Sequence, residues 1–347
     1  MRAPAAQWRV LATGFAVVLL SLLASCGDAS KPLHELAGST MGTTFSVKVV
    51  ALPAEFDPEA LQIEIEHVLG AVNRSMSTYL PDSELSKFNA SRDTAWFRVS
   101  DELCDVVEGA QSINELTGGA FDITVGLLVN LWGFGPDGAV SVPPEEHRIR
   151  ELMRATGHDK LHTDCALPAL KKDIPELHVD LSAYAKGYAV DRLAHLLDAH
   201  NQTNYLVEIG GELRARGMNA KGKPWAIAIE TPARSGRSVR KIIGLDNAAL
   251  ATSGDYRNYF EYENQYFSHT IDPRTGRPVS HNAASVTVLA DTAAFADAIA
   301  TGLLVLGPTD GFEIAERQKI AAYFLLRVGT EIEERMTTIF ASQVYGT

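Results

Sequence analysis

The chain has 347 residues, of which 46% are hydrophobic and 21% are charged. This is the composition of a globular protein with a sizeable core, in one large domain or two closely joined ones. The 31 Lys and Arg residues are outnumbered by 43 Asp and Glu residues, which gives a formal net charge of −12. So acidic a chain is poorly suited to the phosphate backbone of nucleic acid, and we exclude nucleic acid as a partner.

The first 25 residues have the features of an export signal. Two arginines precede an apolar run over residues 10–24, which is too short for a comfortable membrane span. The sequence LASC at 23–26 resembles a bacterial lipobox, in which the cysteine is lipidated and becomes the mature N-terminus. We therefore expect a lipoprotein signal peptide over residues 1–25 and a lipid on Cys26. The alternative is an ordinary signal peptide followed by an incidental cysteine.

Residues 26–37 are predicted to be a tether, and residues 38–347 to form the folded domain. The domain holds the two remaining cysteines, Cys104 and Cys165. An oxidising compartment would permit a disulfide bond between them. Two separately buried thiols are nevertheless the state that we expect, because free cysteine is among the most buried residue types.

The first part of the domain alternates strand and helix signals. Residues 44–50 alternate apolar and polar side chains, which predicts a half-buried strand. An Asp-Pro pair at 57–58 provides the N-cap and first-turn proline of an amphipathic helix, and residues 76–89 then favour a structured loop. A second helix is predicted to begin at Ser100 and to stop at the glycine pair 118–119.

A stretch rich in glycine and aromatic residues follows at 118–135. Backbone could approach a flat or phosphorylated group here, but the stretch alone favours a set of glycine turns around a core aromatic residue. Residues 137–144 are loop-like, and residues 145–155 predict a helix. A strand over 176–181 is then expected to lead into a helix with Ser182 as its N-cap.

The junction of that strand and helix is a natural anion site, because a helix N-terminus presents free N–H groups. Asp180 and Lys186 flank the junction. Lys186 could neutralise a phosphate while Asp180 accepts a hydrogen bond from the ligand. Equally, the two side chains could simply pair with each other.

Strand patterns dominate the C-terminal half. Residues 205–209, 212–216 and 225–230 predict three short strands in an antiparallel meander. Further strands are predicted over 240–245, 249–252, 284–290 and 321–328, a proline-glycine turn within 266–276, and a short helix over 312–318.

Residues 291–306 predict a buried helix, because apolar residues fill almost every position from 295 onward. Asp297 and Thr301 interrupt this apolar stretch, and their spacing places them on one face. A buried carboxylate is costly without a positive partner, and the segment contains no Lys or Arg. A bound cation is one answer, since Asp and Thr oxygens suit Mg²⁺. Alternatively, Asp297 caps a neighbouring loop and Thr301 bonds to its own helix.

Eight motifs follow one another along the chain after the leader. They are GSTMGTTFSV (38–47), MSTY (76–79), GGAFDITVGLLVNLWGFG (118–135), DLSAYAKGYAVD (180–191), YLVEIGGELRARG (205–217), ATSGDYRNYF (251–260), SHTIDPRTGRPV (268–279) and ADAIATGLLVLG (296–307). Together they resemble the ApbE family of FAD:protein FMN transferases. The resemblance implies an α+β, T-fold-like structure, with antiparallel β-sheets flanked by helices and a flavin cleft between two subregions of one domain.

The resemblance also implies an activity. Members of the family bind FAD and Mg²⁺ outside the cytoplasm and attach FMN through a phosphoester to a Thr or Ser of a partner protein, releasing AMP. The expected acceptor carries a Ser/Thr-Gly-Ala-Thr-like segment, as in subunits of sodium-pumping NADH:quinone reductase or related complexes. The expected location is the periplasmic side of the inner membrane, where such subunits reside, with the lipid on Cys26 as the anchor.

The family's functional residues carry over by motif. Its metal ligands fall on the backbone carbonyl of Ala183 and on the side chains of Asp297 and Thr301. Its general base falls on His269, whose ordinary pKa of about 6.5 suits proton removal at neutral pH. Its flavin and adenylate contacts fall on Met41, Tyr79, Ala120, Phe121, Asp122, Asp180, Lys186 and Ile271.

Among these contacts, Met41, Tyr79 and Phe121 are expected to hold the rings by apolar contact and stacking. Two other functions use parts of the same site. A metal-dependent FAD pyrophosphatase would employ water as the nucleophile, and a non-catalytic flavin-binding lipoprotein would need only the FAD contacts. The second alternative leaves Asp297, Thr301 and His269 unexplained.

Overall fold

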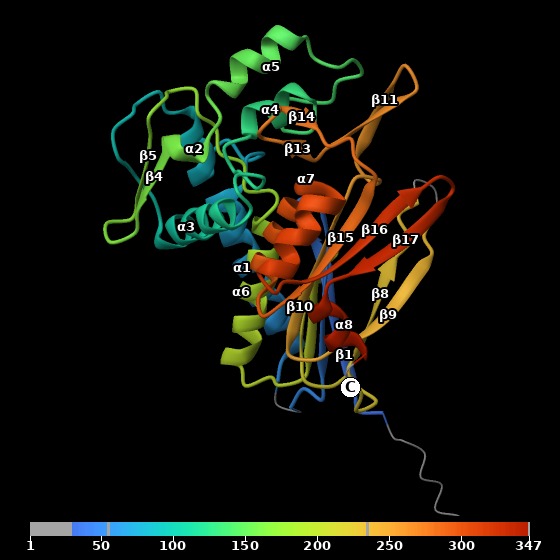
Figure 1. The fold of residues 1–347 in the computed structure, drawn as a ribbon. Helices are drawn as coiled ribbons and strands as arrows, with labels where there is room; N and C mark the ends of the chain where they lie inside the picture. Colours follow the sequence, from blue (N-terminus) through green and yellow to red (C-terminus); the bar gives the residue numbers. More distant parts are fainter. Residues whose placement is uncertain (1–29, 54–55, 234–235, 346–347) are drawn as a thin grey trace, which may run out of the picture.

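The computed structural model describes residues 30–53, 56–233 and 236–345, and an antiparallel sheet of eight strands forms its centre (Figure 1). The predicted signal peptide and Cys26 lie outside the described residues. In spatial order the strands are β1 (Leu33–Thr40), β2 (Thr43–Val50), β6 (Tyr205–Ile209), β7 (Glu212–Arg216), β10 (Ala248–Gly254), β15 (Ala283–Ala290), β16 (Ala321–Val328) and β17 (Glu331–Met336). Every neighbouring pair is antiparallel, so the predicted α+β class is confirmed.

Long helices cover one face of this sheet. They are α1 (Pro58–Met76), α3 (Asp101–Leu116), α6 (Ala185–Ala199) and α7 (Ala293–Arg317). α6 and α7 lie directly against the strands, and α1 and α3 pack outside them. The other face is covered by the hairpin of β8 (Trp225–Glu230) and β9 (Val239–Leu245) and by α8 (Thr338–Tyr345).

Smaller elements complete the chain. The helices are α2 (Glu84–Ala90), α4 (Gly126–Leu131), α5 (Glu146–Met153) and a 3-10 turn at His158–Lys160. The strands are β3 (Phe97–Arg98), β4 (Leu161–Asp164) and β5 (Ala169–Lys172) in one small sheet, and the hairpins β11 (Tyr259–Tyr262) with β12 (Gln265–Ser268) and β13 (Ile271–Asp272) with β14 (Arg277–Pro278). α4, α5 and these two hairpins gather at one end of the central sheet (Figure 1).

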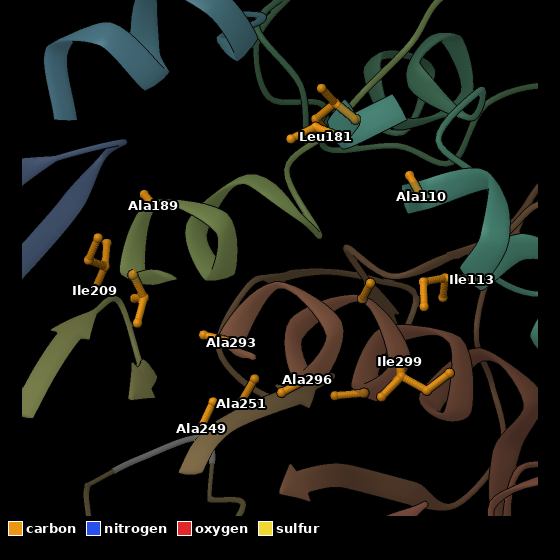
Figure 2. Packing of buried hydrophobic residues seen from close by; sticks show 14 of the residues in the cluster. Ala110, Ile113, Leu181, Ala189, Ile209, Ala249, Ala251, Ala293, Ala296 and Ile299 are labelled. Atoms are coloured by element: carbon orange, nitrogen blue, oxygen red, sulfur yellow. The ribbon is translucent and has the colours of Figure 1, made fainter. Parts of the chain in front are cut away.

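Small side chains bring α7 close to the sheet. Ala293 and Ala296 of α7 and Ala249 and Ala251 of β10 are all buried, and Figure 2 shows them on facing surfaces. Alanines bury apolar area while keeping the two backbones near each other. α7 has the length and apolar composition of a membrane span, yet here it packs against β10, β15 and β16 as a core helix.

The predicted helix starts are confirmed where the cap is local in sequence. Asp57 accepts from the Glu59 N–H at 2.9 Å, and Ser100 accepts from the Leu103 N–H at 3.2 Å. α7 is longer than predicted, because the helix expected over 312–318 continues it beyond a kink at Gly307, whose φ is 81°. Such a φ is accessible to glycine without strain.

Three other element predictions are wrong. Residues 76–89 are not all loop, because Ser83 caps α2 by accepting from the Ser86 N–H at 2.9 Å. Residues 176–181 make only an isolated bridge, between Val125 and His178, and the helix that follows begins at Ala185 rather than after Ser182.

One boundary and one strand pairing also differ from the prediction. Residues 33–37 of the expected tether belong to β1, which pairs with β2 along its whole length. β8 leaves the expected meander, since it pairs with β9 in a separate sheet, whereas β6 and β7 form the predicted hairpin.

Cys104 and Cys165 form a disulfide bond, which corrects the expectation of two free thiols. Cys104 lies on α3 and Cys165 follows β4, and these elements contact each other so that the Cα atoms are 5.7 Å apart. This distance is within the range that a disulfide can bridge. Burial could not distinguish the two states, because both remove the sulfur atoms from water.

Candidate active site

The N-termini of α6 and α7 cap each other. Asp297 of α7 accepts from the Gly187 N–H of α6 at 3.1 Å. Asp191 of α6 accepts in return from the N–H groups of Ala293 and Ala294 at 3.0 and 2.9 Å. Carboxylates are favoured at helix N-termini because they satisfy free N–H groups and the helix dipole. The two helix starts are therefore held in one fixed arrangement.

Two further contacts tighten this arrangement. Arg214 of β7 donates to Asp191 at 2.7 Å and neutralises its buried charge. Gly187 allows the close approach, since a Cβ there would lie 2.2 Å from the Ala293 carbonyl oxygen. Any larger residue at this position would push the two helices apart.

Lys186 supplies the positive partner that the segment around Asp297 lacks. Its Nζ lies 3.5 Å from Asp297 and 3.4 Å from Glu212 at the start of β7. Burial alone would lower the pKa of Lys186, but the two carboxylates outweigh burial and raise the pKa above its ordinary value. Asp180 does not pair with Lys186; it accepts from the Ser182 N–H at 2.7 Å.

Glu212 is the residue of this group that the sequence did not predict. Burial and the nearby Asp297 raise its pKa, while Lys186 lowers it. We call Lys186, Glu212, Asp297 and Thr301 the cation cluster. Its negative charge depends on the ammonium of Lys186 for compensation.

The oxygen atoms at this place suit a divalent cation such as Mg²⁺. Asp297 is 3% exposed, and Thr301, one turn later, shares a 2.8 Å hydrogen bond with Ser253 of β10 rather than bonding back to its own helix. The Gly187 N–H, which in a regular helix would bond to the Ala183 carbonyl, is directed at Asp297 instead. That geometry leaves the Ala183 carbonyl oxygen available as a ligand.

The donor set also fits the preference of Mg²⁺ for few protein ligands. Within the described part of the chain, no cluster of three or more His, Cys, Asp or Glu side chains could hold a metal. Mg²⁺ commonly takes one or two carboxylates and completes its shell with other oxygens and water. One carboxylate, one hydroxyl and one carbonyl match this pattern better than a zinc-type site.

His269 follows the β11–β12 hairpin, and we call residues 259–269 the His269 hairpin. The ring Nδ1 of His269 lies 3.1 Å from the carbonyl oxygen of Asn258, and the backbone N–H of His269 donates to the same oxygen. Because a carbonyl only accepts, Nδ1 carries the hydrogen and Nε2 is free to accept a proton.

The surroundings of His269 keep the imidazole neutral. Burial is the main cause that lowers its pKa, and the charge of Lys186 lowers it further, while the Asn258 carbonyl and Asp255 oppose the shift. The ring also packs edge-on against Phe134, with centroids 6.3 Å apart. A neutral imidazole with an open Nε2 is the form that a general base requires.

Tyr79 and Met41, two of the predicted ring contacts, are both accessible to solvent, at least in part. Tyr79 is 62% exposed, and its hydroxyl donates weakly to the Phe134 carbonyl at 3.4 Å, beside the ring that touches His269. Burial and the charge of Asp180 raise its pKa. Met41 occupies the β1–β2 turn with a φ of 49° and is half-buried.

Four further predicted contacts are buried or partly buried. Phe121 is 3% exposed and packs beside Gly302, so it has little free ring surface. Ala120 and Ile271 are also buried. Asp122 turns toward the Thr124 and His158 backbone N–H groups, and its burial raises its pKa.

Two cavities border the segment that holds Asn258. One of about 430 Å³ is lined by residues that include Glu230, Arg237 and Arg257. The other, of about 150 Å³, reaches Ser268 and Arg327. Neither is lined by the cation cluster, which is defined by its charges and hydrogen bonds.

Comparisons with known proteins identify the family of the chain. The ApbE family model matches residues 41–324. The FAD:protein FMN transferase of Vibrio cholerae serotype O1 is 45% identical over 325 residues, covering 94% of this chain and 96% of that protein. The enzyme of the same name from Haemophilus influenzae is 43% identical, with coverage of 95% and 97%.

Solved structures give the same result. The flavin transferase ApbE from Vibrio cholerae superposes with a TM-score of 0.84 at 43% identity, covering 90% of this chain and 100% of that one. The apo form of Pseudomonas stutzeri flavinyl transferase ApbE superposes with a TM-score of 0.83 at 38% identity, covering 91% and 98%. By sequence and by fold, the chain is a member of the ApbE family.

Proposed function

We propose that the chain is an Mg²⁺-dependent FAD:protein FMN transferase, which moves the FMN part of FAD onto a Thr or Ser hydroxyl of an acceptor protein and releases AMP. The relatives that carry this name match the chain over nearly its full length. The observation that carries the proposal is the cation cluster, in which the buried Asp297 meets Lys186 at 3.5 Å; a His269 whose pKa is lowered by burial and by the charge of Lys186 supports it.

The reaction needs charge neutralisation more than covalent help from the enzyme. The acceptor hydroxyl oxygen attacks the FMN-side phosphorus, the bond from that phosphorus to the bridging oxygen breaks, and the bond's electron pair leaves with AMP. His269 takes the hydroxyl proton on Nε2. Lys186 faces the negative charge that collects on the phosphate oxygens.

A divalent cation held by Asp297, Thr301 and the Ala183 carbonyl would supply further positive charge to the pyrophosphate when bound. Tyr79 and Met41 would contact the rings, and Asp180 would accept a hydrogen bond from the ligand. Ala120, Phe121, Asp122 and Ile271 would shape the walls.

The place of action follows from the leader and the cysteines. We propose that Cys26 is lipidated and anchors the protein to the periplasmic side of the inner membrane. The Cys104–Cys165 disulfide supports an extracytoplasmic location, because such bonds persist mainly in oxidising compartments. The proposed acceptor is an electron-transport subunit with a Ser/Thr-Gly-Ala-Thr-like segment, as in sodium-pumping NADH:quinone reductase or related complexes.

The test is incubation of the protein with FAD and Mg²⁺, with and without such an acceptor, followed by intact mass measurement and AMP detection. We expect AMP and an acceptor heavier by one FMN group, and both should require the acceptor hydroxyl. AMP with an unmodified acceptor and free FMN would instead identify an FAD pyrophosphatase. Bound FAD without AMP would identify a non-catalytic flavin-binding protein.

A further inference from the structure

Glu212 has one buried carboxylate oxygen that lacks a hydrogen-bond partner among the described residues. Its side chain is 6% exposed, and Oε1 faces Lys186 Nζ at 3.4 Å. Among the described residues, none donates a hydrogen bond to the buried Oε2. An unsatisfied buried acceptor is costly, especially on a charged group, so its presence calls for an explanation.

The backbone around Glu212 holds its carboxylate in place. Glu212 follows the tight turn of Gly210 and Gly211, and a Cβ on Gly210 would lie 3.0 Å from Thr43 and 3.4 Å from Glu212 Oε2. The carboxylate is thus confined between this turn and Lys186. The flexible group in contact with it is the lysine, whose side chain is 27% exposed.

A cation at Asp297 would change the position of Lys186. In the structure the ammonium bridges Asp297 and Glu212. A divalent cation on Asp297 would repel an ammonium only a few ångströms away, and this repulsion is strong where water is excluded. Lys186 must then give up Asp297, and its charge needs another acceptor.

We propose that Glu212 is a positioning residue that receives Lys186 when a divalent cation binds Asp297. The ammonium then donates to both Oε1 and Oε2 of Glu212, which satisfies the unpartnered oxygen, clears the cation position and keeps the positive charge beside the substrate phosphates. This inference rests on the cation site of the proposed function.

Direct binding of Mn²⁺, used as the probe for the divalent cation, tests the inference without any activity measurement. Free Mn²⁺ is followed by its paramagnetic resonance signal in wild type, Glu212→Gln, Lys186→Met and the double variant. Glutamine has the shape of glutamate, and thermal unfolding of each variant verifies the fold. Glu208→Gln is the matched control, because Glu208 lies in the same hairpin but bonds to the Gly211 N–H instead of Lys186.

We expect Glu212→Gln to weaken Mn²⁺ binding by roughly three- to thirtyfold, because Lys186 then stays on Asp297. In the Lys186→Met background the same substitution should have no effect, and Glu208→Gln should leave affinity unchanged. Unaltered affinity in Glu212→Gln would overturn the inference. Equal weakening in both backgrounds would also overturn it, since Glu212 would then ligate the cation itself.

The variant Asp297→Ala distinguishes failure of the Glu212 inference from failure of the proposed cation site. Wild-type Mn²⁺ affinity in that variant would show that the cation site of the proposed function is wrong, and the role of Glu212 would fall with it. Lost affinity in Asp297→Ala together with unaltered affinity in Glu212→Gln would overturn the Glu212 inference alone.

Discussion

The cation cluster and the His269 hairpin are built in opposite ways. The cation cluster stands on two helix starts that cap each other with buried carboxylates, Asp191 and Asp297, and both face the central sheet. The imidazole of His269 is held by one hydrogen bond, to the Asn258 carbonyl, and by an edge contact with Phe134. The two carboxylates at the helix starts are therefore fixed by several hydrogen bonds from distant segments, whereas the contacts that hold Lys186 are longer and those that hold His269 are fewer.

The largest effect should come from removing the carboxylate of the cation cluster. We expect Asp297→Ala to abolish FMN transfer and its Mg²⁺ dependence, because the cation loses its only carboxylate ligand. Lys186 keeps Glu212 as a partner, so the variant should still fold. Transfer assays at increasing Mg²⁺ and a circular-dichroism spectrum provide the measurements.

Asp297→Asn is the matched control, because its amide oxygen can still cap the Gly187 N–H. We expect it to fold like wild type and to be as inactive as Asp297→Ala. Unchanged transfer in either variant would refute the metal assignment.

His269→Ala should lower the rate of transfer and leave binding intact. General-base removal typically costs about 10²- to 10⁴-fold in rate. FAD and Mg²⁺ should bind as in wild type, since the cation cluster does not contact this side chain. Fluorescence titration with FAD and single-turnover kinetics separate the two quantities. Loss of FAD affinity in His269→Ala would show that His269 binds FAD. It would contradict the separate roles given to the cation cluster and the His269 hairpin.

Asp191→Ala tests whether the reciprocal caps hold the two helix starts of the cation cluster in place. The variant frees two N–H groups of α7 and leaves Arg214 unpaired, so we expect the free energy of unfolding to fall by about 3–5 kcal/mol. Urea unfolding measures this change. Asp198→Ala is the control, because Asp198 lies on the same helix but its pair with Arg216 is more exposed. The Tyr205 hydroxyl, which also donates to Asp198, keeps the Ala194 carbonyl as an acceptor, so we expect about 1 kcal/mol there. Equal losses in the two variants would contradict a special role for the caps.

Thr301→Val should have the smallest effect. It removes one hydroxyl with little change in shape, so we expect Mg²⁺ affinity to fall roughly tenfold and the stability to stay near wild type. A Mg²⁺ titration of transfer activity checks this. A titration curve equal to that of wild type would mean that Thr301 only bonds to Ser253.

The sequence predicted those parts of the site that rest on local patterns. The apolar run around Asp297 predicted that this carboxylate is buried, and the structure confirms the burial. The family and the fold class are confirmed as well. The roles given to the site residues remain predictions, because they concern ligands rather than the fold.

The rest depended on contacts between distant segments. Lys186 and Asp297 are 111 residues apart in the sequence, and no pattern of neighbouring residues predicts that they pair. For the same reason Ser182 was predicted to cap α6, although the cap that reaches Gly187 comes from α7. The ring contact given to Phe121 stays a prediction, because an aromatic residue among glycines can fill a core and also border a ligand.

The dependence of the transfer rate on pH in wild type and in His269→Ala tests the account most directly. A histidine base works only when neutral, and burial lowers the pKa of His269. The wild-type rate should therefore hold at neutral pH and fall at a pH below the ordinary histidine pKa of about 6.5, and this acidic limb should be absent from the variant. If the limb survives unchanged in His269→Ala, another group such as Asp272 takes the proton, and the division between the two regions is wrong.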